Sequence, residues 1–120
     1  MDSSAPPVWA LPEVFESLEA GEAAASLADL VEAFRSDTAR RLATLRIAIA
    51  AGDLARVRAE VHSIKGSARQ MGAEALAAAC LEIETGIAHS AALPLPGPVD
   101  HLEVCFSTAC SAMNTYAGSL

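Results

Sequence analysis

Aromatic residues are scarce in this chain of 120 residues. They make up 4% of it, although hydrophobic residues make up 52% and many of those are alanine. Alanine-rich sequence with regularly spaced leucines and few aromatic residues is typical of helix bundles rather than of sheets. The composition therefore predicts an all-α fold, and the length predicts one domain.

Long apolar segments are also missing. No uncharged apolar run reaches 18 residues, so we expect no membrane-spanning helix and no membrane partner. The first residues lack the positive region and apolar core of a signal peptide. These absences lead us to expect a cytoplasmic protein.

Motifs for metal, redox and nucleotide chemistry are absent as well. The three cysteines, Cys80, Cys105 and Cys110, show no Cys-x-x-Cys spacing, and we expect buried, reduced thiols. His89 and His101 have no metal-ligand spacing, which argues against a metal site. A glycine-rich phosphate loop is lacking too, so we expect no ATP binding and no autonomous kinase activity.

Basic residues are few, and they are unevenly placed. Eight lysines and arginines face fifteen acidic residues, which gives a net charge of −7 and argues against a nucleic-acid partner. Residues 53–72 nevertheless carry four basic and two acidic side chains, a local charge of 4 − 2 = +2. A positive stripe on an acidic protein suggests an anionic or acidic partner surface.

The hydrophobic period predicts the organisation of the chain. Helices are expected over residues 11–20, 23–51, 54–71, 73–91 and 99–117. Gly21 should end the first helix, Gly52 and Asp53 should separate the second from the third, and residues 93–98 should form a stiff loop. We therefore predict an antiparallel up-down four-helix bundle with a short extra N-terminal helix. Residues 1–10 would be a flexible N-terminal segment, with Val8 and Trp9 able to pack on the bundle, and residues 11–120 a single helical domain.

The same period predicts which side chains are buried. The seam of the long helix over residues 23–51 is expected to be Leu27, Leu30, Val31, Phe34, Thr38, Leu42, Leu45 and Ile49. The seams of the last two helices are expected to be Leu76, Cys80, Ile83, Ile87, Val99, Leu102, Phe106, Ala109, Met113 and Tyr116.

The most specific pattern lies in the helix over residues 54–71. Its apolar stripe is Val57, Val61, Ile64, Ala68 and Met71. His62 lies about 140° around the helix from Val57 and so faces solvent. Lys65 and Gly66 follow His62 by three and four residues, on the same face. Glycine costs a helix roughly 1 kcal/mol relative to alanine, and a close approach of a partner to the bare backbone would explain it.

The run from Glu60 through His62, Lys65, Gly66 and Ser67 to Gly72, continuing to Glu84, resembles the histidine-containing phosphotransfer (HPt) domain family. Matching features are His-x-x-Lys-Gly-Ser and a glycine ten residues after the histidine. The resemblance covers about residues 23–118 and implies a phosphorelay carrier. Such a carrier accepts a phosphoryl group from a receiver-domain aspartate or a histidine kinase and passes it to a response regulator.

The resemblance also implies roles for individual residues. His62 would be the phospho-accepting nucleophile through Nε2, Lys65 would steady the phosphoryl oxygens, and Gly66 would let the receiver approach. Glu84, 22 residues after His62, would orient the imidazole, since a carboxylate that accepts from Nδ1–H leaves Nε2 free. We expect that the protein has no cofactor of its own and that the receiver supplies Mg²⁺.

Several assignments rest on position alone. Arg58 and Arg69 share the face of His62 and would contact the partner, or else serve solubility. Ser67 would contact the partner or the phosphate, or bond locally, and Glu84 could be a plain surface carboxylate.

Two rival functions stay open. One is the dimerisation and phosphoacceptor module of a histidine kinase, although Ser63 follows His62 where such modules usually carry an acidic residue. A monomer, which we expect, would argue against this rival. The other is an adaptor bundle that binds a receiver domain without accepting phosphate.

Overall fold

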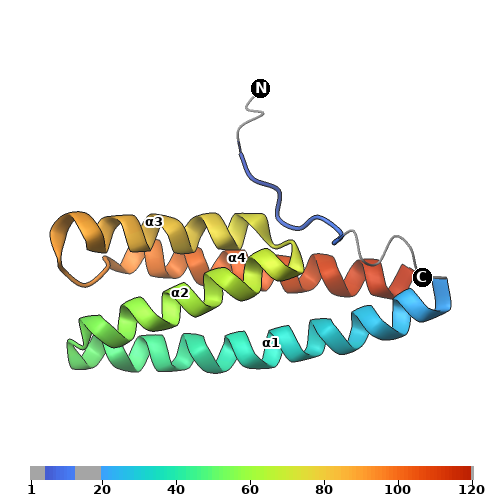
Figure 1. Cartoon of the computed structure of the whole chain (residues 1–120), viewed down its shortest axis with the longest axis horizontal. Helices are drawn as coiled ribbons and strands as arrows, with labels where there is room; N and C mark the ends of the chain where they lie inside the picture. The colour runs from blue at the N-terminus through green and yellow to red at the C-terminus, as the bar shows by residue number, and fades with distance from the viewer. Residues whose placement is uncertain (1–4, 13–19, 120) are drawn as a thin grey trace.

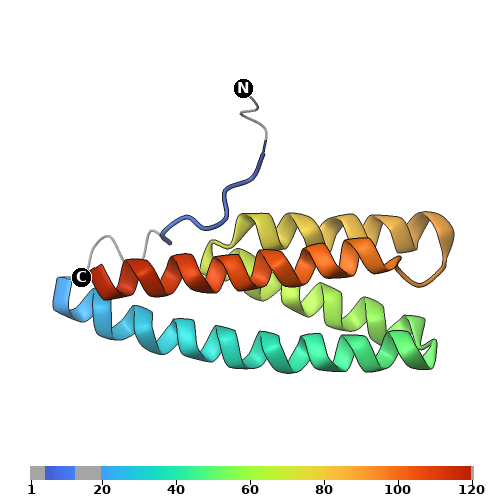
Figure 2. The same ribbon diagram turned by 180° about the vertical axis from the view of Figure 1, so that it is seen from behind.

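Four helices form the described part of the protein, a computed structural model that describes residues 5–12 and 20–119 (Figure 1). They are α1 (Ala20–Ala51), α2 (Leu54–Met71), α3 (Glu74–Ser90) and α4 (Pro96–Ser119). Each helix packs against the next in the chain, and α4 returns to α1, so the order closes into an antiparallel bundle (Figures 1 and 2). The predicted all-α four-helix bundle is confirmed. In the described residues, no helix combines the length and apolar character needed to cross a bilayer.

The two turns that flank α2 form as the sequence predicts. Gly52 adopts a left-handed φ of 71°, and the Asp53 carboxylate caps α2 by accepting a hydrogen bond from the Arg56 amide at 3.1 Å. At the other end, Gly72 has a φ of 78° and donates its amide to carbonyls of the last turn of α2. Helix α2 therefore begins and ends at residues that suit its two termini.

The core follows the predicted seams with one error, and the predicted seam residues Ile49, Phe106 and Tyr116 are partly buried where they pack against it. All five apolar stripe residues of α2 and all four predicted seam residues of α3 are buried. Leu30 was predicted to be buried, but it is 44% exposed. Its neighbours Leu27 and Val31 fill the core, and Leu30 lines a surface groove between α1 and α2 beside Phe34.

Two helix boundaries also differ from prediction. Helix α4 begins at Pro96, inside the segment predicted to be a loop. Prolines are tolerated in a first turn because the amides there have no intrahelical acceptor. Helix α1 begins at Ala20, so Gly21 lies inside a helix instead of ending one. Most of the short helix predicted over residues 11–20 lies outside the described residues.

The N-terminal segment of residues Pro7–Ala10 is bound to the turn between α2 and α3. Trp9 Nε1 donates to the Met71 carbonyl at 2.7 Å, and its ring packs against Tyr116 of α4 at a centroid distance of 5.4 Å. The Ala10 amide donates to the Gly72 carbonyl at 2.9 Å. Trp9 thus packs as expected, and this segment, which we name the N-terminal strap, ties three helix ends together.

Gly72 is required for this arrangement in two ways. Its positive φ strains any other residue, and a Cβ there would lie 2.0 Å from the Ala10 carbonyl oxygen. We expect Gly72→Ala to lower the free energy of unfolding by roughly 1–3 kcal/mol. Denaturation in urea followed by circular dichroism measures the loss. The fluorescence of Trp9, the only tryptophan, reports release of the strap by a red shift.

Gly86→Ala is the matched control for that prediction. Gly86 lies inside α3 with open space around it, so alanine should stabilise the helix by about 0.5–1 kcal/mol. Equal stability of the two variants would contradict the role assigned to Gly72.

Candidate functional site

His62 projects from the solvent face of α2. Its side chain is 73% exposed, while its neighbour Val61 is fully buried. The apolar stripe turns one side of α2 into the core, and the period of the helix then places His62 outside. The predicted exposure of His62 is confirmed.

Glu84 of α3 holds the imidazole from one side. Its Oε2 atom lies 3.1 Å from Nδ1 of His62. A carboxylate only accepts hydrogen bonds, so Nδ1 carries the proton and donates it. In the neutral imidazole the unprotonated nitrogen is then Nε2, which keeps its lone pair. The geometry fits the orienting role predicted for Glu84.

Lys65 shares the same carboxylate. Its Nζ atom lies 2.5 Å from Glu84 Oε1, and its side chain is 13% exposed. The sequence placed Lys65 on the solvent face with Arg58 and Arg69, but the structure folds its side chain against α3. His62, Lys65 and Glu84 therefore form one cluster, named here the His62 triad, in which a single carboxylate serves two partners.

The protonation of Glu84 reflects these contacts. Burial by itself raises the pKa of the carboxyl group, but the hydrogen bonds from Lys65 and His62 outweigh burial and leave the pKa below its usual 4.5. Glu84 is therefore an anion at neutral pH and accepts from Nδ1–H as a charged group.

Arg58 and Arg69 are the exposed cations of this face. Of the eight basic side chains, six form ion pairs with carboxylates, and these two form none within residues 5–12 and 20–119. They lie four residues before and seven after His62, on the side of α2 that faces α3. The local positive charge thus comes from two side chains, since Arg56 pairs with Glu60.

Gly66 and Ser67 lie on different sides of α2. Gly66 is exposed, with nothing within 4 Å of the position a Cβ would take, so a bare patch of backbone lies beside His62. Ser67 instead lines the groove between α1 and α2 that Leu30 and Phe34 also line. The structure does not bring Ser67 to the imidazole.

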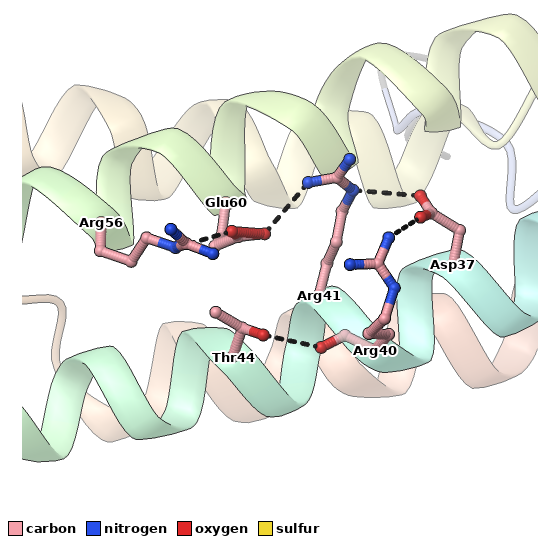
Figure 3. A network of polar contacts seen from close by, with 6 residues as sticks. All are labelled: Asp37, Arg40, Arg41, Thr44, Arg56 and Glu60. Atoms are coloured by element: carbon pink, nitrogen blue, oxygen red, sulfur yellow. Dashed lines mark hydrogen bonds and ion pairs between the residues drawn. The ribbon is translucent and has the colours of Figure 1, made fainter.

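A charged network that the sequence analysis missed fixes α2 against α1 (Figure 3). Glu60 is 5% exposed and accepts from Arg41 of α1 at 3.1 Å and from Arg56 at 3.0 Å. Arg41 also donates to Asp37 at 3.0 Å, and this bond lowers the pKa of the Asp37 carboxyl group. The only signal in the sequence was a glutamate adjoining the apolar stripe. Breaking a buried pair leaves an uncompensated charge, so the network holds the two helices in one alignment.

The three thiols are poorly suited to reaction. All three cysteines are buried, as predicted, and burial raises the pKa of Cys80 to about 12. No cluster of three potential metal ligands occurs in the part of the chain that the structure describes.

The comparison with known families agrees with this site. The family model for the Hpt domain matches residues 29–114, which include the whole His62 triad. The chain belongs to the Hpt domain family. This family places the protein among the phosphorelay histidine phosphotransfer domains, which carry phosphoryl groups and are not kinases. It also implies interaction with receiver domains of two-component systems.

A solved structure supports the fold of this Hpt domain. The crystal structure of histidine-containing phosphotransfer protein B (HptB) from Pseudomonas aeruginosa PAO1 superposes with a TM-score of 0.74 at 24% identity, and the match covers 99% of each chain. None of the curated proteins matches this chain.

The lowered pKa of Glu84 makes its contribution to stability pH-dependent. Because the folded pKa is below the unfolded value, the contribution is complete above about pH 4.5 and is lost as the pH falls through the folded pKa. We expect wild type to exceed Glu84→Gln by about 1 kcal/mol in free energy of unfolding near pH 7, with the difference vanishing in acid. Urea denaturation at a series of pH values measures it.

Glu82→Gln is the control. Glu82 lies two residues away on α3, is exposed, and forms no ion pair with a described residue. The same acid dependence in both variants would contradict the assignment to Glu84.

Proposed function

We propose that this protein is a phosphorelay intermediate whose His62 accepts a phosphoryl group from the phospho-aspartate of a receiver domain and passes it to another receiver. The observation that supports this most is the exposed imidazole with Nδ1 bound to Glu84 and Nε2 free. An anionic acceptor on Nδ1 fixes the tautomer that a nucleophilic Nε2 requires.

The transfer balances without another reactant. The Nε2 lone pair attacks phosphorus, an N–P bond forms, and the bond between phosphorus and the aspartate oxygen breaks, which returns a carboxylate to the receiver. Nδ1 keeps its proton and its hydrogen bond to Glu84, whose negative charge stabilises the positive charge that develops on the ring. The reverse sequence delivers the group to the next aspartate.

Lys65 and the flanking arginines would supply positive charge to the phosphoryl group and to the receiver surface. Lys65 Nζ is bound to the same carboxylate as the imidazole, and in this proposal its side chain rotates from Glu84 to meet the phosphoryl oxygens. Arg58 and Arg69 face an acidic receiver surface, and Ser67 lies at its rim on the α1 side. In this proposal the protein acts as a cytoplasmic monomer. The Mg²⁺ that neutralises phosphoryl charge is held by the receiver.

His62→Gln tests the proposal directly. We expect radiolabelled phosphate to pass from a phosphorylated receiver to wild type but not to His62→Gln, with label that is acid-labile and base-stable. Helical circular dichroism should be unchanged because the His62 side chain is 73% exposed. Receiver binding without any label on wild type would instead favour an adaptor, and a dimer in solution would favour a kinase module.

Gly66→Gln tests the close approach of the receiver. The position has open space around it, so the variant should fold with slightly greater helix stability, by up to about 1 kcal/mol. The added side chain should nevertheless slow transfer by roughly tenfold or more, because a displacement of about 1 Å is costly in a positioned reaction. Transfer kinetics with Gly66→Ala as the smaller control measure the effect. Wild-type rates in Gly66→Gln would sink the argument for close approach.

A further inference from the structure

A large apolar side chain lies on α3 beside the His62 triad. Leu81 is 46% exposed and sits one helical turn before Glu84. Single exposed leucines are common and need no explanation by themselves. The case for Leu81 rests on what lies at the same level on α2.

The contact between His62 and Glu84 fixes the alignment of the two helices. Because α2 and α3 run antiparallel, a step of about one turn from His62 to Gly66 corresponds to a step of one turn back from Glu84 to Leu81 (Figure 1). Leu81 therefore lies level with Gly66, across the helix pair. A partner that comes close to the Gly66 backbone must also meet Leu81.

The side chains around Leu81 on α3 are shorter than Leu81 or are turned away from it. Its neighbours one turn away are Ala77 and Ala78 on one side and Glu84 and Thr85 on the other. Alanine and threonine are short, and the Glu84 side chain is turned to the His62 triad. Leu81 thus rises from a low surface, as the apolar centre of an interface does inside a polar rim.

The cations of α2 indicate the charge of the partner. The exposed cations of this face, Arg58 and Arg69, lie on α2, across the helix pair from Leu81. An interface burying about 800 Å² per partner has a radius of roughly 16 Å, which reaches from His62 over Leu81 and both arginines. The occupant that fits is an acidic surface that carries an apolar residue where it meets Leu81.

We propose that Leu81 is the apolar anchor on which the receiver domain docks, its contact aligning the receiver's acidic pocket with His62. This inference rests on the proposed function, because the receiver is its occupant. Leu81 contributes to docking and takes no part in the reaction at Nε2.

Leu81→Ala, Leu81→Met and Val104→Ala test this inference. Val104 of α4 is 61% exposed, and α4 packs against α1 and α3, so it is a matched apolar control away from His62. The donor is the phosphorylated receiver domain that labels wild type fastest. We expect Leu81→Ala to raise the KM for this receiver about five- to thirty-fold at nearly constant kcat. Leu81→Met should keep the KM near the wild-type value, and Val104→Ala should leave the KM unchanged.

Phosphoramidate, a small donor with no docking surface, separates docking from reactivity. It should label His62 equally in wild type and Leu81→Ala. Slower labelling by phosphoramidate, an unchanged KM in Leu81→Ala, or an equal effect of Val104→Ala would each overturn the role of Leu81. If no receiver labels wild type although phosphoramidate does, the proposed function fails, and the anchor fails with it.

Discussion

One carboxylate organises the functional face of this protein. Glu84 divides its two oxygens between His62 and Lys65, which stand one turn apart on the same face of α2. The imidazole tautomer, the position of the lysine and the level of Leu81 all follow from that contact. The contact in turn depends on how α2 and α3 are aligned, since a slide of one turn, about 5.4 Å, would part the groups.

The alignment is held at points outside the His62 triad. Gly72 makes the turn between the two helices, and the absence of its side chain leaves room for the N-terminal strap. On the other side of α2, the buried Glu60 is fixed by Arg41 of α1. These constraints place His62 on an exposed surface while the backbone beneath it stays in one position, as the proposed transfer would require.

The sequence predicted the parts that depend on helical period. A period of 3.6 residues was enough to bury Val61 and to expose His62, and the glycines themselves located the turns at Gly52 and Gly72. It failed at Leu30, because two seam residues already fill the core there, and at Pro96, because first-turn amides need no partner. The ion pairs of Lys65 and Glu60 were out of reach for another reason. Long charged side chains choose partners across helices, and that choice depends on distances in the folded bundle.

The sharing of Glu84 also bears on how firmly a phosphoryl group can be held. Phosphate on Nε2 would bring a charge near −2 to a site whose lysine is already paired with an anion. Lys65 can then stabilise the phosphoryl oxygens only by giving up part of its contact with Glu84. In the proposed relay this competition is useful. A carrier that stabilised the phosphohistidine too strongly would not pass the phosphoryl group on. The negative charge of Glu84 beside the phosphoryl group limits that stabilisation, so transfer to the next aspartate stays favourable.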